Sequence, residues 1–241
     1  MEFPAAQEYQ LRFTVIATNL AVGLSDNERD QESVEMLREV HRVAREMHER
    51  WKEVPEYEAT YAESASTLAW QLLEVRENDE AKRLLALAVP VLKRHISDLP
   101  TSSYYYARAR WGTAKILAES DPSAARKMLE EAALFMRGLT TTHPENEAFR
   151  LNLGALCFDI VATESADTTG SVDDRRIATE LVIEEGVGLY RQFLNEKGGE
   201  FVLRHLGSTL ESTACVEHES FRQLLNDART SIEEQQIKKS E

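Results

Sequence analysis

The sequence predicts an all-α protein, an α-solenoid of about five antiparallel helix pairs. Three observations carry this prediction: apolar residues recur at helical spacing, proline and glycine are scarce, and one short residue pattern returns along the chain. The 241 residues include only 6 Pro and 10 Gly, so few breaks separate long elements. Val, Ile and Thr form no alternating runs, which disfavours strands.

Helical spacing is clearest in the second quarter of the chain, where apolar residues follow at steps of four, four, three and four. At 3.6 residues per turn, such steps place the residues on one face of a helix. These residues are Tyr57, Tyr61, Ala65, Leu68 and Leu72. Segments 36–47, 85–96 and 129–139 show the same spacing.

Proline and glycine mark the ends of the expected helices. Asp121-Pro122 is typical of a cap followed by proline in the first turn, where the missing N–H has no helical partner to lose. Val54-Pro55 and His143-Pro144 predict helix starts in the same way, with acidic residues following. Gly198-Gly199 predicts a break. We expect loops at 25–32 and 166–174.

A polar, a large apolar and a small residue stand together five times. The large residues are Leu20, Leu68, Trp111, Leu153 and Leu206, at intervals of 48, 43, 42 and 53 residues. A small residue after each lets two helices approach closely at a crossing point. We therefore predict one repeat array over 1–241, with stacked units at 4–54, 55–100, 101–143, 144–198 and 199–236.

The two best copies resemble the tetratricopeptide repeat, which has a large apolar residue and a small one in its first helix, small residues in its second, and a closing proline. One copy carries Leu68, Ala69, Ala81 and Ala88, and the next carries Trp111, Gly112, Ala125, Ala132 and Pro144. The units exceed the family's usual length of about 34 residues. They look like the longer units appended to bacterial serine/threonine kinases and signalling ATPases, and no kinase signature is present.

This resemblance implies a protein–protein interaction scaffold that holds a partner protein or peptide in a concave groove and forms the repeat portion of a larger signalling protein, with no enzyme activity. By analogy with the family, the groove positions flank each small residue. They give Ser66, Trp70, Thr113, Leu151 and Arg204, with Thr18 and Val22 in the first copy. Trp70 either anchors a peptide or packs against the next repeat.

Three consecutive tyrosines, Tyr104 to Tyr106, form the most unusual local feature. Steps of about 100° prevent all three from facing one core, so at least one is expected at the surface or in the groove. We include Tyr106 as a candidate peptide anchor. The alternative is that two rings pack between repeats and the third covers the entry turn.

The net charge of −14 disfavours binding to nucleic acid and to anionic membranes. No apolar run reaches the roughly 18 residues of a membrane helix, and the N-terminus lacks the pattern of a signal peptide. Cys157 and Cys215 show no pairing pattern, which favours reduced thiols in the cytoplasm.

No motif for a catalytic, cofactor or metal site occurs, and we expect none of the three. Cys215 and His218 are too few for structural zinc. His41 and His48 share a helix face, either as a pH-sensitive or metal pair or as a partly buried face. A helical-scaffold enzyme or a peptide-sensing regulator without a recognisable motif is the alternative to a binding scaffold.

The first residues, Phe3-Pro4, resemble a linker that elsewhere follows the second helix of a repeat. Repeat arrays need polar ends. We therefore expect an exposed apolar end at the first helix, covered by an upstream domain or by self-association.

Overall fold

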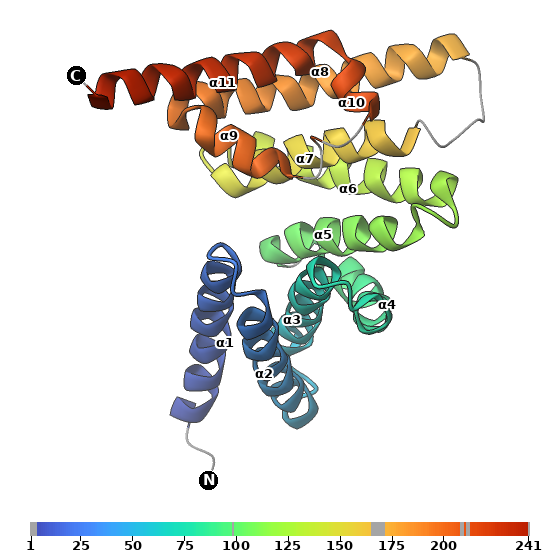
Figure 1. The fold of residues 1–241 in the computed structure, drawn as a ribbon. Helices are drawn as coiled ribbons and strands as arrows, with labels where there is room; N and C mark the ends of the chain where they lie inside the picture. The colour runs from blue at the N-terminus through green and yellow to red at the C-terminus, as the bar shows by residue number, and fades with distance from the viewer. Residues whose placement is uncertain (1–3, 98, 165–171, 208–209, 211–212, 241) are drawn as a thin grey trace. The chain divides into compact units, whose positions relative to one another are not determined.

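The computed structural model describes residues 4–97, 99–164, 172–207, 210 and 213–240. All of the regular secondary structure in these ranges is helical, which confirms the predicted all-α class (Figure 1). None of the described helices is long and apolar enough to cross a bilayer.

The chain divides into two compact units, Met1–Ile116 and Leu117–Glu241, here called the N-terminal and C-terminal units. The prediction of one continuous array over both stays a prediction. Helices α1 (Pro4–Ser25), α2 (Asp30–Arg50), α3 (Pro55–Glu74), α4 (Asn78–His95) and α5 (Pro100–Leu117) belong to the first unit. Helices α6 (Pro122–Thr142), α7 (Glu147–Glu164), α8 (Val172–Lys197), α9 (Gly199–Leu206), α10 (Thr213–Glu217) and α11 (Glu219–Ser240) belong to the second.

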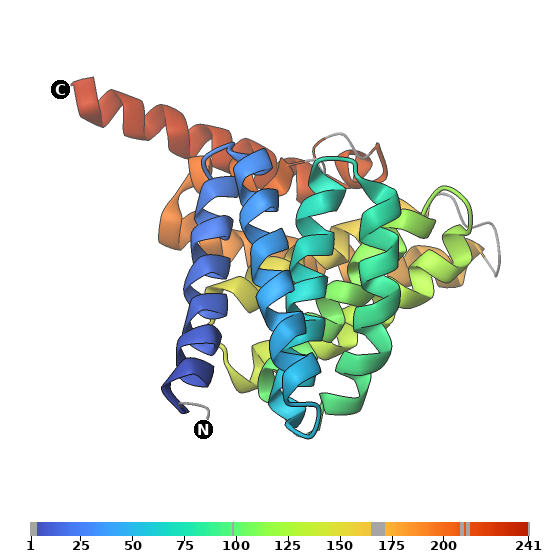
Figure 2. The same ribbon diagram turned by 90° about the horizontal axis from the view of Figure 1, so that it is seen from below.

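Helices that follow one another in the sequence pack together in each unit. In the N-terminal unit α2 contacts both α1 and α3, and α3 contacts α4. Figure 2 shows these four helices side by side, joined by short turns. In the C-terminal unit α7 contacts α6 and α8, and α11 packs on α8 and α9.

Two of the predicted helix starts are confirmed. Helix α3 begins at Pro55, and α6 begins at Pro122, where the Asp121 side chain accepts a hydrogen bond of 2.9 Å from the backbone N–H of Ala124. The third is wrong: Pro144 lies in the turn before α7. Asn146 caps that helix instead, since its side-chain oxygen accepts from the backbone N–H of Phe149 at 3.2 Å.

The loop expected at 25–32 is shorter than predicted. Helix α1 continues to Ser25 and α2 starts at Asp30, because the Ser25 hydroxyl donates to Asp30 Oδ1 at 2.8 Å across the turn. Gln71 Nε2 of α3 donates to the same oxygen at 2.9 Å. This small polar network ties three helices together at one end. Of the loop expected at 166–174, residues 166–171 lie outside the described residues.

The predicted small residues mark real crossing points in two copies. A Cβ atom added at Gly112 would lie 3.3 Å from Leu85 Cδ1, and one at Gly154 would lie 2.7 Å from Tyr190 Cε2. In the fifth copy the prediction is wrong. Gly207 is exposed, has a φ of 44°, and ends α9. The interval 199–236 therefore holds two short helices and most of α11 in place of a helix pair.

Candidate protein-binding surface

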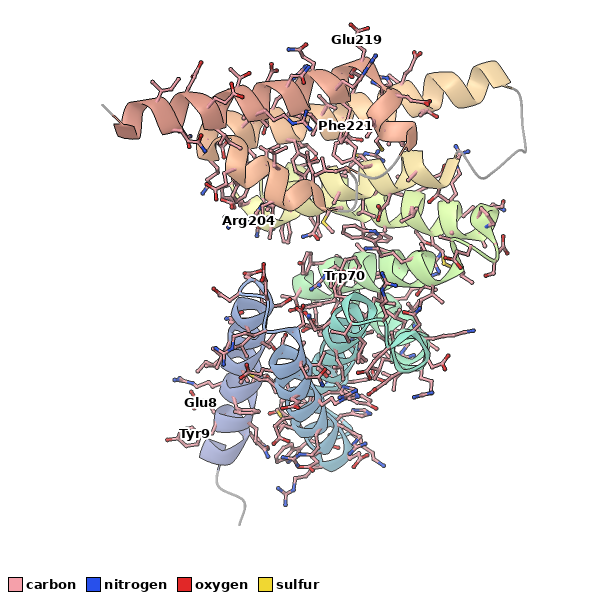
Figure 3. The ribbon with its side chains drawn as sticks, viewed as in Figure 1. Glu8, Tyr9, Trp70, Arg204, Glu219 and Phe221 are labelled. Carbon is pink, nitrogen blue, oxygen red and sulfur yellow. The ribbon has the colours of Figure 1, made fainter. Side chains whose placement is uncertain are left out.

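Helix α1 carries seven exposed large apolar side chains. Four of them, Tyr9, Phe13, Ile16 and Leu20, follow at steps of four, three and four and form what we call the outer row. Their exposed fractions are 72%, 41%, 67% and 53%. Figure 3 shows Tyr9 projecting from α1 on the side away from α2. The other three, Leu11, Val15 and Val22, lie on the opposite flank of the helix.

The repeat interval of 48 residues maps the outer row onto α3, where one matching large side chain is buried and two tyrosines are half-buried. Leu68, which matches Leu20, is only 1% exposed. Tyr61, which matches Phe13, stacks on the rings of His41 and His48 of α2, with centroids 4.9 and 5.6 Å away. Helix α2 thus packs on the face of α3 that corresponds to the exposed face of α1.

A pocket of about 170 Å³ lies on the other flank of α1. Leu11 and Val15 of α1 and Val40 of α2 form its apolar lining, and Glu63 of α3 and Tyr105 of α5 also line it. Drug-sized ligands occupy pockets of about 300–1,000 Å³, so this one suits a single side chain better than a cofactor.

Four hydroxyl groups that line the pocket already donate hydrogen bonds to backbone carbonyls. Thr14 donates to Leu11 O, Thr60 to Glu56 O and Ser64 to Tyr61 O, each at 2.7 Å, and Thr67 donates to Glu63 O at 3.0 Å. A hydroxyl has one proton and two lone pairs. These groups can therefore only accept a further hydrogen bond from anything that enters the pocket.

Glu63 supplies the carboxyl group of the pocket. Its Oε1 accepts from the hydroxyls of Thr101 at 2.8 Å and Ser102 at 3.4 Å. Its Oε2 takes part in no hydrogen bond or ion pair with the described residues. Oε2 is also absent from the fully buried polar atoms that lack a hydrogen-bond partner among these residues. Burial raises the pKa of Glu63, and the two hydroxyl hydrogen bonds and the charge of His95 only partly oppose the shift.

The tyrosine triplet contributes through Tyr105, whose side chain lines the pocket. Burial, followed by the nearby Glu63 charge, raises the pKa of Tyr105 to about 12, so its hydroxyl stays protonated. Tyr106 is 1% exposed and forms part of the core. The choice of Tyr106 as an anchor is thereby corrected, because its ring is already enclosed within the N-terminal unit.

Trp70 lies between α3 and α5, as Figure 3 shows. Its ring centroid is 4.6 Å from that of Trp111, and the Arg108 guanidinium and the Lys115 amine lie 5.2 and 5.1 Å from the ring. These contacts correspond to packing against the next repeat. The ring is only partly buried, so part of it remains available for a partner.

The remaining predicted residues do not gather around the pocket. Ser66 is buried and its hydroxyl donates to Tyr105 O at 3.3 Å, which removes it from the surface. The Thr113 hydroxyl is occupied by Ala109 O at 2.8 Å. In the C-terminal unit, Leu151 packs on the core and Arg204 is exposed beside Glu200, 3.3 Å away.

Sequence reasoning did not single out Glu63, and it chose the buried Tyr106 where Tyr105 is the tyrosine that lines the pocket. Glu63 matches Val15 of the first copy at the 48-residue interval, so a carboxylate replacing an apolar residue at one repeat position was the available signal. Thr18, which the groove analogy did predict, lines the pocket.

No family model, curated protein or solved structure matches this chain. Within the described ranges, no three His, Cys, Asp or Glu side chains converge as a metal site would require.

Proposed function

We propose that this chain is a protein-interaction module that holds a partner protein along α1. The outer row is the observation that carries the proposal. The same repeat positions on α3 are covered by a neighbouring helix, whereas on α1 they are exposed. Clusters of exposed apolar side chains on one helix are typical of protein-binding surfaces.

The two flanks of α1 suit a protein better than a small molecule. The outer row offers apolar area, and the opposite flank offers a pocket with a carboxylate and hydroxyl acceptors. Apolar contact with a few placed polar groups is the usual composition of a peptide-binding groove. We propose that a partner segment lies in the groove between α1 and α3, as the resemblance to tetratricopeptide repeats implies.

We also propose that the chain is a tetratricopeptide-like scaffold of a signalling protein in the cytoplasm. What supports this is the succession of helices packed on their sequence neighbours, with small residues at the crossings in two copies. Neither Cys157 nor Cys215 is in a disulfide. A similar fold does not by itself establish a function, because one fold can serve many functions. Binding therefore has to be measured.

The test is selection from a displayed library of random peptides on the full-length chain, followed by affinity measurement on three variants. Ile16→Glu/Leu20→Glu places charges on the outer row, and Val15→Glu/Val22→Glu places them on the groove flank. Leu181→Glu is the matched control, because Leu181 is an exposed apolar residue of α8.

Charges on the flank of α1 that a selected peptide contacts, whether the outer row, the groove flank or both, are expected to weaken that peptide by about tenfold or more, since buried apolar contacts at an interface centre commonly contribute over 1 kcal/mol. The control should bind as the parent does. Peptides that bind all three variants with parental affinity would overturn the proposal.

Trp70 receives a separate measurement. If its exposed part contacts the partner, Trp70→Ala weakens the selected peptides while the helical circular dichroism stays unchanged. Unchanged affinity in the folded variant assigns Trp70 to packing on Trp111 alone.

A further inference from the structure

We infer that the pocket beside Glu63 is a receptor for the ammonium group of a lysine side chain carried by the partner. The inference rests on the proposed function and names the chemistry that the partner must offer. It is built on the hydrogen-bond capacity of the lining, the occupancy of the two Glu63 oxygens, and the size of the pocket.

The lining offers several acceptors to a group rich in donors. The hydroxyls of Thr14, Thr60, Ser64 and Thr67 each donate to a backbone carbonyl and present lone pairs only. Glu63 in its ionised form also only accepts. Thr18, Asn19 and Tyr105 line the pocket too and can donate. An ammonium group, with three donors and no acceptor, matches the Glu63 carboxylate and the four hydroxyl acceptors.

The occupancy of Glu63 distinguishes lysine from arginine. Arginine binds carboxylates best through two parallel hydrogen bonds that need both oxygens. Here Oε1 already accepts from Thr101 and Ser102, which leaves Oε2 as the open acceptor. One open carboxylate oxygen, in a pocket whose lining also offers hydroxyl lone pairs, suits the three rotatable donors of an ammonium.

The charge of the site has the sign that a cation requires. Burial penalises the ionised carboxylate of Glu63. Its described hydrogen-bond partners are hydroxyls, and the charge of His95 opposes the burial effect less than they do. An entering ammonium supplies a counter-charge in direct contact. The protein carries a net charge of −14, which also attracts cationic segments from a distance.

The apolar part of the pocket fits the lysine stem. Leu11, Val15 and Val40 line it, and Tyr105 adds an aromatic ring. A long aliphatic stem buries its methylene groups against such side chains while its head reaches a polar group. An ammonium near an aromatic face gains a further attraction. The volume of about 170 Å³ admits one such side chain.

The experiment uses n-butylammonium, which is the lysine side chain alone, as the probe of the full-length chain. Methyl resonances of Leu11, Val15 and Val40 report its entry by NMR titration. Neutral n-butanol and n-propylguanidinium, the arginine analogue, are the comparison ligands. We expect saturable shifts with n-butylammonium and at least about tenfold weaker binding of the other two, because the charge-assisted hydrogen bond is lost or poorly matched.

Two variants locate the site. Glu63→Gln keeps an oxygen for Thr101 and Ser102 but replaces the open acceptor with a donor, so binding should weaken by at least about tenfold. Val15→Lys, at an exposed position that needs no repacking, should block the probe with its own ammonium. Glu74→Gln is the control, since it removes the same charge from an exposed position on α3.

Equal binding of n-butanol, tighter binding of n-propylguanidinium, or unchanged affinity in Glu63→Gln overturns the inference. These outcomes are separable from failure of the proposed function. Selected peptides that depend on the outer row but bind Glu63→Gln with parental affinity contradict the lysine pocket alone. Peptides that ignore every α1 variant contradict the proposed function, whatever the probe does.

Discussion

The two units place their large apolar side chains in opposite ways. The C-terminal unit encloses four aromatic rings, those of Phe158, Tyr190, Phe193 and Phe221, in one cluster. Its described exposed large apolar residues lie singly on separate elements. The N-terminal unit instead exposes seven large apolar side chains on α1 alone.

The interiors differ in the same sense. Among the described residues, all eight buried polar side chains lie in the N-terminal unit. Ser64, Thr67 and Gln71 of α3 are among them, each with a hydrogen-bond partner. Buried polar groups are tolerated when they are paired, and they define geometry more than they add stability. The C-terminal unit thus encloses its large aromatic rings, whereas the N-terminal unit exposes apolar side chains on α1, the surface that we propose for a partner.

The sharpest test of this contrast is one substitution made in both units. Phe221→Ala is expected to cost about 3–5 kcal/mol in free energy of unfolding, because the ring is fully buried against Phe158 at 5.0 Å. Phe13→Ala is expected to cost less than about 1 kcal/mol, since its ring is exposed on α1. Similar losses would remove the contrast.

Denaturant titration can follow the two units separately. All three tryptophans, Trp51, Trp70 and Trp111, belong to the N-terminal unit. Their fluorescence therefore reports the unfolding of that unit, whereas circular dichroism reports the helices of both.

A second pair compares the helix crossings. Gly154→Ala is expected to destabilise by about 1–3 kcal/mol, because the new Cβ would meet the buried Tyr190 ring at 2.7 Å. Gly112→Ala meets only flexible leucine ends, the nearest at 3.3 Å, and alanine favours the helix by about 1 kcal/mol. We expect it to be neutral or stabilising. A larger loss at Gly112 than at Gly154 would reverse the interpretation.

The smallest expected effect is a pH dependence of the N-terminal unit. Burial, with Arg45 nearby, lowers the pKa of His41 to about 4 from an ordinary 6.5, against an opposing contribution from Glu80. As the pH falls below 6.5 the unfolded chain takes up the proton first, so stability is lost towards pH 4. Between pH 7 and pH 5 this amounts to about 1 kcal/mol after allowance for partial exposure.

The control is His41→Asn, whose amide can take the place of Nδ1 beside the Ser64 hydroxyl, 3.0 Å away in the parent. Tryptophan-monitored unfolding of parent and variant at both pH values isolates the histidine from the carboxylates. An identical pH dependence in the two proteins would assign the loss to other groups.

Much of the helical architecture was predictable from local chemistry. Apolar spacing and the capping residue Asp121 place helices correctly, because both act within one or two turns. The predicted start of α7 was misplaced because proline is compatible with a turn as well as with the first turn of a helix. Asn146 caps α7 instead, since its side chain accepts from the backbone N–H of Phe149. Gly207 was predicted to lie at a helix crossing, but it has a positive φ and ends α9. The sequence alone does not show whether a glycine is needed for its small size or for a positive φ.

The candidate site was less predictable, since it depends on which side chains meet across helices. The repeat pattern located Thr18, but no local signal shows that Glu63 and Tyr105 face one pocket. The choice among Tyr104, Tyr105 and Tyr106 needed the rotation of α5, which the pattern of three identical residues does not provide. The orientations that leave the Thr14 and Ser64 hydroxyls with lone pairs only are likewise a property of the folded backbone.

The outer row has a consequence for how such a protein can grow. Because Leu20 and Phe13 occupy the register that Leu68 and Tyr61 occupy in the interior, a helix pair fused ahead of α1 would convert surface into core without altering either residue. Lengthening by duplication then requires one new junction rather than a redesigned interior. At these two positions the first helix already carries the residue types of the helix packed inside the unit.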